Sequence, residues 1–229
     1  MRIHGLQKMS LVDYPGKVAC TVFLGGCDFR CPYCHNAELL SEDAPAVMDD
    51  LELLDFLKKR QGLLDGVVIT GGEPLLRKDL PELLKRIREL GYPIKLDTDG
   101  NHPGKLKEVV LEGLVDYVAM DVKNSPKRYG ETIGIPAFNV RRVDESIHFL
   151  LEGNADYEFR TTVVKQLHDE ESFKKIGEWI KGADHDFLQK FVDRDTVPFA
   201  GLTGPDDEEM SKYLDIIRLY VPSAELRGI

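Results

Sequence analysis

Long hydrophobic runs are missing from this chain of 229 residues. Its apolar segments have the length of strands, far below the roughly 20 residues that a helix needs to cross a bilayer. Basic charge is also scarce, because 30 Lys and Arg residues stand against 40 Asp and Glu residues, giving a net charge of −10. This balance argues against a nucleic-acid groove and against an anionic membrane surface. With no recognisable signal peptide, we expect a cytoplasmic protein.

Cysteine is sparse as well, with four residues in the chain. Such usage is typical of a reduced, intracellular protein rather than one stabilised by disulfides. Cys20 lies in the apolar segment 18–23, where we expect a buried strand, because a free Cys behaves as a small hydrophobe. The other three, Cys27, Cys31 and Cys34, are crowded into eight residues. This concentration is the strongest chemical signal in the sequence.

Three thiolates on one tight loop suit an iron–sulfur cluster that the protein ligates incompletely. A four-iron cluster bound wholly by protein takes four Cys ligands, so one iron here needs a ligand from elsewhere. Metal sites leave such a position open for a reacting molecule. A zinc site formed by these cysteines and His35 is the alternative, although zinc ligands usually arrive as two separated pairs.

Strand-like and helix-like segments alternate along the chain. We expect strands at residues 17–24, 66–70, 93–96, 115–122, 157–164 and 187–192, and helices at 50–59, 80–90, 105–111, 140–151, 170–181 and 206–220. Six βα units imply an α/β fold with a parallel sheet and right-handed crossovers. No linker is recognisable, so we expect a single domain spanning 1–229.

Polar residues follow the predicted strands, at the sheet edge where parallel α/β proteins place their sites. Those in or just after the carboxyl-terminal parts of the second to fifth strands, two glycines included, are Gly71, Gly72, Glu73, Asp97, Thr98, Asp99, Asp121, Lys123 and Arg160. Charged groups are expensive to bury unpaired, which predicts a polar ligand between them, while the glycines let backbone approach that ligand closely. The alternatives are an ordinary βα turn at the glycines and salt bridges across the barrel mouth.

The Cys-x3-Cys-x2-Cys spacing, with Tyr33 just before the last Cys, resembles the signature of the radical S-adenosylmethionine (SAM) enzymes. Six βα units are too few for a full eight-unit TIM barrel, and they match the partial (β/α)6 barrel of that family. The resemblance implies a [4Fe–4S] cluster on the three cysteines, with SAM on its open iron. Tyr33 would then contact the adenine, and Gly71-Gly72-Glu73 the SAM amino group.

Residues 5–17 and 21–36 resemble the anaerobic ribonucleoside-triphosphate reductase activating proteins, and also the pyruvate formate-lyase activating enzymes. In such glycyl-radical activases, carboxylates hold a monovalent cation beside SAM, which makes Asp97 and Asp121 the candidates. Oxygen ligands suit a hard cation. Asp99 departs from the Asp-Thr-Asn-Gly run of these relatives, so a polar contact by that residue is in doubt.

The candidates for binding the cofactor are Tyr33, His35, Gly71, Gly72, Glu73, Thr98, Lys123 and Arg160. Arg160 suits bidentate recognition of an anion, either the SAM carboxylate or the ribose, and a structural role inside the barrel is equally open. Gln189 is a weaker candidate. The scattered histidines, expected at the surface or on helices, are His4, His102, His148, His168 and His185.

The resemblance implies a reaction in which the reduced cluster gives one electron to SAM, and the 5′-deoxyadenosyl radical abstracts hydrogen from a backbone glycine. The favoured partner is anaerobic ribonucleotide reductase, with flavodoxin or ferredoxin as electron donor. Two other classes stay open. One is a radical SAM enzyme acting on a small molecule, such as a 7-carboxy-7-deazaguanine synthase, and the other is a noncatalytic zinc or iron–sulfur module. The absence of further CxxC motifs predicts a single cluster.

Overall fold

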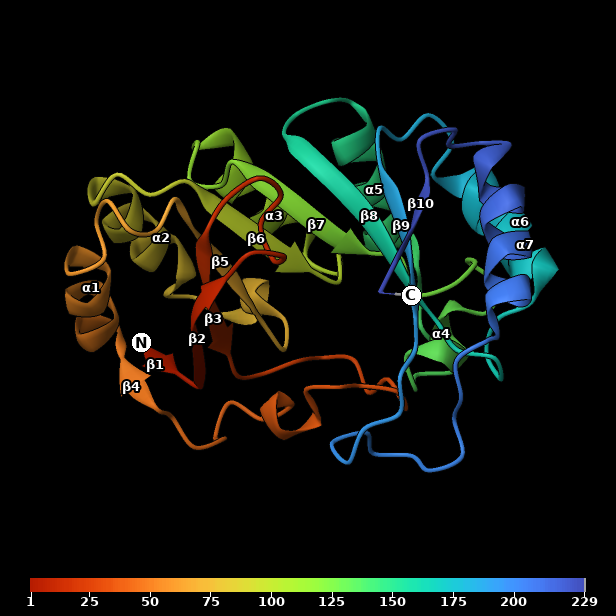
Figure 1. The fold of residues 1–229 in the computed structure, drawn as a ribbon, viewed down its shortest axis with the longest axis horizontal. Helices are drawn as coiled ribbons and strands as arrows, with labels where there is room; N and C mark the ends of the chain where they lie inside the picture. Colours follow the sequence, from red (N-terminus) through yellow and green to blue (C-terminus); the bar gives the residue numbers. More distant parts are fainter. Residues whose placement is uncertain (229) are drawn as a thin grey trace.

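An eight-stranded sheet, in the order β10-β9-β8-β7-β6-β5-β3-β2, forms the centre of the computed structural model, which describes residues 1–228 (Figure 1). Six neighbouring strands are mutually parallel: β3 (Ala19–Leu24), β5 (Gly66–Gly71), β6 (Ile94–Thr98), β7 (Tyr117–Asp121), β8 (Asp156–Val163) and β9 (Asp186–Lys190). They are the six predicted strands, so the parallel α/β barrel is confirmed.

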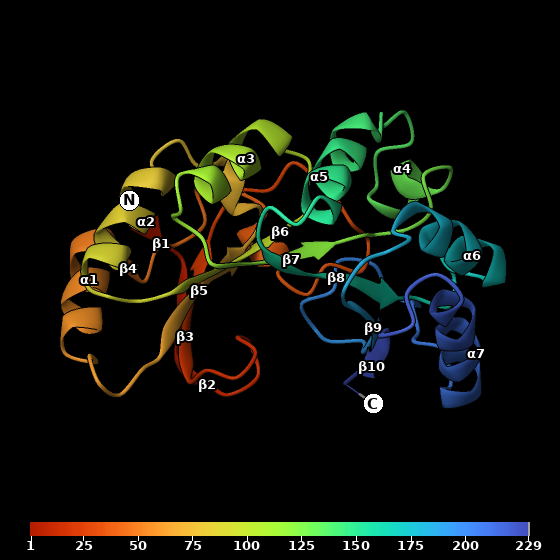
Figure 2. The ribbon, with the colours of Figure 1, turned by 90° about the horizontal axis from the view of Figure 1, so that it is seen from above.

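Six helices pack around the convex side of this sheet (Figure 2). They are α1 (Asp50–Lys58), α2 (Leu80–Glu89), α3 (Pro103–Leu111), α5 (Arg141–Leu151), α6 (Glu170–Trp179) and α7 (Asp207–Arg218). Their starts are encoded locally, since Asp49 with Glu52 and Asp206 with Glu209 form capping boxes. Among the described residues, no helix is long and apolar enough to span a membrane.

The edges of the sheet differ from the prediction. β2 (Gly5–Ser10) pairs antiparallel with β3, and β10 (Glu225–Arg227) pairs parallel with β9. Neither was predicted, because β2 exposes three consecutive residues and β10 is only three residues long. Since these two strands are the ends of the sheet order, the barrel is an open arc.

Short elements complete the fold. β1 (Arg2–Ile3) and β4 (Met48–Asp49) form a two-stranded antiparallel sheet, and three helical turns are η1 (Ala37–Leu39), η2 (Pro74–Leu76) and α4 (Tyr129–Thr132). The loop after β3 and the loop after β9 both run below the sheet in Figure 1, at the carboxyl ends of the strands. This is the edge where the sequence placed the site.

Candidate functional site

The carboxyl ends of the parallel strands surround a cavity of about 270 Å³. Every residue that the sequence nominated as a cluster, cofactor or cation ligand lines it, with the single exception of Glu73. Gln189 and Asp99 line it as well. The register of the sheet brings these side chains together, because each parallel strand delivers its last residues to the same edge.

Three thiols face this cavity, and all four cysteines are free. Burial raises the pKa of Cys31 to about 12 and also raises the pKa of Cys27 and Cys34. These groups therefore prefer the neutral form unless a cation stabilises their thiolates, as a metal cluster does. The donor set, three soft sulfurs on one loop, fits an iron–sulfur cluster.

The two glycines after β5 are required by the backbone around them. A Cβ atom on Gly71 would lie 2.2 Å from the carbonyl oxygen of Leu24, and one on Gly72 would lie 2.1 Å from that of Gly26. Gly71 also has a φ of +121°, in the region that favours glycine. The turn after β5 thus packs directly against the cysteine loop, a reason for these glycines that the sequence did not reveal.

Glu73 is fully buried, and its carboxylate faces the end of β6. It accepts hydrogen bonds from the Thr98 hydroxyl at 3.0 Å, from Asp99 N at 2.7 Å and from Leu75 N at 2.8 Å. Burial raises its pKa to about 7, against the effect of these donors. The Glu73 carboxylate therefore holds Thr98 and Asp99 in place at the end of β6. Direct contact between Glu73 and a ligand stays a prediction.

An ion-pair network crosses the cavity floor. The Arg160 cluster, as we name it, comprises Lys95, Asp97, Asp121, Lys123 and Arg160. Arg160 donates to Asp121 at 3.0 Å and to Asp97 at 3.2 Å, Lys95 to Asp97 at 2.6 Å, and Lys123 to Asp121 at 2.8 Å. These are the salt bridges that the sequence left open as an alternative. Three cations against two carboxylates leave one positive charge.

The protonation states follow from these contacts. Burial alone would raise the pKa of Asp121, but Arg160 and Lys123 lower it to about 2. Burial alone would also raise the pKa of Asp97, but the charges of Arg160 and Lys95 outweigh burial and lower this pKa. Asp121 in turn holds the pKa of Lys123 well above its usual value despite burial. Asp97, Asp121, Lys123 and Arg160 therefore favour their charged forms.

Lys95 was missed by the sequence reading. It sits in the middle of β6 with 2% of its residue surface exposed. The available signal was its spacing of two from Asp97, because alternate residues of a strand point to the same face. An Asp at the end of a strand thus marks Lys95 as an inward-facing residue.

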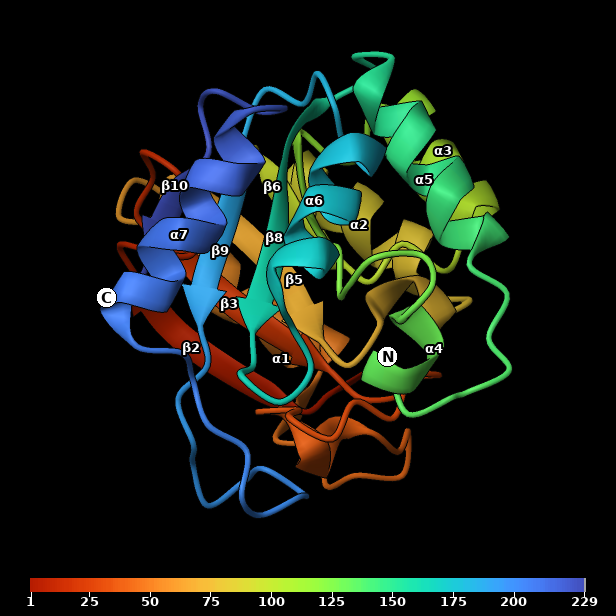
Figure 3. The ribbon, with the colours of Figure 1, turned by 90° about the vertical axis from the view of Figure 1, so that its right-hand side faces the viewer.

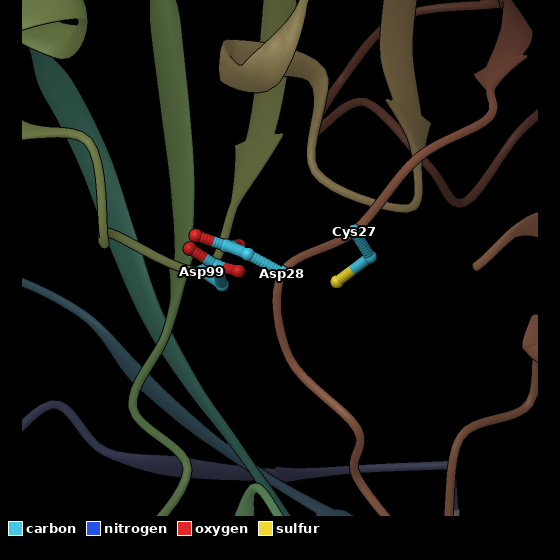
Figure 4. Close-up of side chains that lie close together, drawn as sticks. All are labelled: Cys27, Asp28 and Asp99. Carbon is cyan, nitrogen blue, oxygen red and sulfur yellow. The ribbon is translucent and has the colours of Figure 1, made fainter. Parts of the chain in front are cut away.

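A second polar group lies behind Cys27. The Asp99 cluster, as we name it, comprises Asp28, Glu73, Asp99 and Asn101. One atom from each of Cys27, Asp28 and Asp99 lies within 4.8 Å of the others, and the two carboxyl groups lie side by side (Figure 4). Burial, then the charges of Glu73 and Asp28, raise the pKa of Asp99 well above its usual value. Burial and the neighbouring carboxylates therefore favour the neutral form of Asp99.

Aromatic contacts position two further candidates. Tyr33 is buried, its hydroxyl group has no hydrogen-bond partner among the described residues, and its ring meets Phe191 edge-on at 6.4 Å. The His35 ring stacks on the same Phe191 ring, with 5.3 Å between the centroids, and its Nε2 lies 2.7 Å from Val192 O. An unpaired buried hydroxyl is costly, so the Tyr33 side chain fits a site that receives a polar ligand.

The expectation that the scattered histidines lie at the surface or on helices is wrong for two of them. His4 is buried and its Nδ1 accepts a hydrogen bond from Gly25 N at 2.8 Å, behind the cysteine loop. His168 is buried in the loop after β8, with Nε2 2.9 Å from Lys123 O. Both were missed because one partner of each, Gly25 N for His4 and Lys123 O for His168, lies in a distant segment of the sequence.

Comparisons with known proteins agree with this geometry. A family model described as the radical SAM superfamily matches residues 21–180. MJ1227 of Methanocaldococcus jannaschii, a protein inferred to be a glycyl-radical enzyme activating enzyme, is 33% identical over 99% of this chain and 96% of its own length. The pyruvate formate-lyase-activating enzyme of Clostridium pasteurianum is 35% identical over 54% of this chain and 52% of its own.

Solved structures show the same fold. A domain of the pyruvate-formate lyase-activating enzyme from Bacteroides vulgatus matches 71% of this chain and 99% of its own, with a TM-score of 0.59 at 21% identity. Streptococcus suis SuiB bound to S-adenosylmethionine matches 91% of this chain and 52% of its own, with a TM-score of 0.70 at 13% identity. The radical SAM superfamily uses a [4Fe–4S] cluster and SAM. The chain belongs to this superfamily and, within it, to the glycyl-radical enzyme activating enzymes.

Proposed function

We propose that this activating enzyme installs the glycyl radical of an anaerobic ribonucleoside-triphosphate reductase. The observation that carries the proposal is the cavity at the strand ends, in which three free thiols meet a polar floor with one excess positive charge. The choice of partner is supported by residues 5–17 and 21–36, which resemble the activating proteins of that reductase.

Cys27, Cys31 and Cys34 would hold a [4Fe–4S] cluster, leaving one iron for SAM. When bound, the cluster and SAM supply one-electron chemistry that produces a radical able to take hydrogen from a glycine. The chain's own part is to bind, orient and shield. A flavodoxin or ferredoxin would deliver the electron.

The Arg160 cluster would receive the SAM carboxylate. Lys123 and Arg160 line the cavity, and the excess positive charge of the cluster is balanced once a single carboxylate binds. A monovalent cation at Asp97 and Asp121 is the other prediction for this place. It would have to share both carboxylates with Arg160, which already bridges them.

Tyr33 and the strand-end backbone would orient the nucleoside part of SAM. The Tyr33 hydroxyl needs a hydrogen-bond partner, and a bound nucleoside offers several. Thr98 is less available, because its hydroxyl already donates to Glu73 and accepts from Gly100 N. Phe29 lines the cavity, and Phe191 packs edge-on against Tyr33, so aromatic side chains help to keep water from a reactive radical.

The test is anaerobic reconstitution of the cluster, reduction with dithionite, addition of SAM and purified reductase, and electron paramagnetic resonance. We expect a doublet from a glycyl radical on the reductase, absent with Cys31→Ser. Cys20→Ala is the matched control, because Cys20 is buried in β3 away from the cavity, and it should retain the signal. Cleavage of SAM without a radical on the reductase would reject this partner.

Activation of a pyruvate formate-lyase is the second candidate. It is favoured by the 35% identity to the Clostridium pasteurianum enzyme and by the shared fold with the Bacteroides vulgatus domain. The same assay with a formate-lyase in place of the reductase separates the two, since only the true partner should gain the doublet at catalytic concentrations of activase.

A further inference from the structure

A second cavity of about 370 Å³ lies where α3 and α5 begin, on the outer side of the cysteine loop. Its lining is formed by Asn101, Phe138, Asn139, Arg141 and Arg142. Figure 3 shows the long loop from α4 to α5, which carries Phe138, on the flank opposite the loop that follows β9. This outer cavity is therefore separate from the mouth of the site.

One layer of side chains separates the two cavities. Phe29 lines the inner cavity, and its ring meets Phe138 of the outer cavity edge-on, with 5.3 Å between centroids. Beside this contact, Asn101 of the outer cavity donates a hydrogen bond to Asp28 at 2.7 Å, and Asp28 directly follows Cys27 in the chain. A molecule seated on the outer cavity would thus be one side chain away from the cysteine loop.

Positive charge gathers on this flank of an otherwise acidic chain. Arg141 and Arg142 are exposed and have no ion-pair partner within residues 1–228. Arg30 is exposed too, with Nη1 donating to Cys27 O and Phe29 O at 2.6 Å each. Its main chain packs on the same loop, because Arg30 N donates to Ile133 O at 2.9 Å.

The acidic groups nearest in sequence are already engaged. Glu131 pairs with Arg128 at 3.6 Å, and Glu145 pairs with Lys107 at 2.7 Å. Asp144 accepts a hydrogen bond from the Trp179 indole at 2.8 Å, but the indole is neutral, and Asp144 lines a neighbouring cavity together with Arg141. This one carboxylate stands against Arg30, Arg141 and Arg142, so the flank stays positive although the whole chain carries a net charge of −10.

We propose that the basic flank, defined as Arg30, Phe138, Arg141 and Arg142, docks an acidic one-electron carrier protein. The inference rests on the proposed function, because only a redox cluster behind the loop needs such a donor. One electron leaves the reduced carrier and enters the cluster, and no bond or proton changes hands. Charge complementarity selects this occupant, since the net negative charge elsewhere repels an acidic protein. Docking on this flank leaves the inner cavity free for SAM and a glycine.

The test uses reconstituted enzyme and a purified, photoreduced flavodoxin as the probe. Bleaching of cluster absorbance is followed by anaerobic stopped flow, and binding of oxidised flavodoxin by calorimetry. For Arg141→Glu/Arg142→Glu we expect at least ten-fold slower reduction and weaker binding at low salt, with the difference shrinking as salt rises. Acidic residues at the start of a helix favour its dipole, so this variant should fold.

The control is Lys174→Glu/Lys181→Glu, which makes the same charge change at two exposed lysines in and just after α6. It should behave like the wild type with flavodoxin. Dithionite is a small reductant that needs no docking, so it should reduce all three proteins equally.

Equal flavodoxin rates and affinities for the wild type and Arg141→Glu/Arg142→Glu would overturn the proposal. Slower reduction of Arg141→Glu/Arg142→Glu by dithionite would also overturn it, and so would loss of radical transfer from the dithionite-reduced variant. Either result would mean that the flank has another role. Failure of the proposed function is distinguishable, because dithionite-reduced wild type would then yield no radical on the reductase while calorimetry still reports docking.

Discussion

Asp97 and Asp99 lie two residues apart where β6 ends, and their carboxyl groups have opposite surroundings. Asp97 contacts Arg160 and Lys95, and its pKa is lowered although burial works against this. No Lys or Arg of the described residues 1–228 pairs with Asp99, and burial together with the charge of Glu73 raises its pKa. Residue type and burial are therefore insufficient to assign a role to a strand-end carboxylate.

The two clusters differ in the charge that they present to the site. In the Arg160 cluster every carboxylate is paired, and the surplus charge is positive, which suits an anionic ligand. In the Asp99 cluster, Asp28 Oδ1, Asp99 Oδ2 and Asn101 Oδ1 are buried and find no hydrogen-bond partner in the part of the chain that the structure describes. Nearby charges decide whether burial keeps a carboxyl group charged or neutral, and the two clusters represent the two outcomes.

Arg160→Ala should produce the largest effect on this comparison. Removing the guanidinium takes away one of the two cations beside each of Asp97 and Asp121, and deleting one partner of a buried ion pair costs about 3–5 kcal/mol. Urea unfolding of the apo-protein measures the loss, and SAM binding by the reconstituted enzyme should also fall. Arg160→Lys keeps the charge but not the two-pronged geometry, so it should be intermediate. A loss below about 1 kcal/mol for Arg160→Ala would mean that the cluster is not a structural unit.

The pH dependence of stability should run in opposite directions for the two clusters. Asp121 has a folded-state pKa of about 2, below its unfolded value of 3.8, so its contribution is present above pH 3.8 and is lost as pH falls toward 2. Glu73 has a folded-state pKa of about 7, above its unfolded value of 4.5. Its contribution is complete below pH 4.5 and is lost as pH rises through 7.

Urea midpoints of the apo-protein between pH 3 and 8 measure both effects, with Glu73→Gln as the control. Gln cannot ionise, so this variant should lose the decline between pH 4.5 and 7 and keep the decline below pH 4. An unchanged decline at neutral pH in Glu73→Gln would show that the raised pKa of Glu73 is not its source.

The sequence predicted the large-scale arrangement well because it depends on local patterns. Hydrophobic periodicity located six strands and six helices, and the rule that parallel strands deliver their ends to one edge brought twelve of the thirteen candidates to one cavity. The partners within the cavity could not be predicted in the same way. Arg160 pairs with Asp121 because β7 and β8 place these residues opposite each other in register, and register is a long-range property.

The hydrogen-bond partners of Glu73 and His4 were not predicted, because they depend on the direction of each side chain in the folded chain. The turn after β5 directs Glu73 to the Thr98 hydroxyl and to the backbone of Asp99, two partners that the sequence did not reveal, and its contact with a ligand stays a prediction. His4 was expected at the surface or on a helix, but β2 folds antiparallel onto β3 and carries the residue just before it to Gly25. In each case the deciding partner lies more than 20 residues away in the sequence.

The same substitution at the two neighbouring positions gives the smallest and sharpest test. Asp97→Asn removes a charge that Arg160 and Lys95 need, so it should destabilise the apo-protein by about 2–4 kcal/mol. Asp99→Asn keeps the oxygen that accepts from Asn101 N, and its new amide can donate to the unpaired oxygen of Asp28. It should therefore be neutral or stabilising, by up to about 1 kcal/mol. Urea unfolding at pH 7 measures both, and a loss at Asp99→Asn as large as that at Asp97→Asn would show that the two carboxyl groups do the same job.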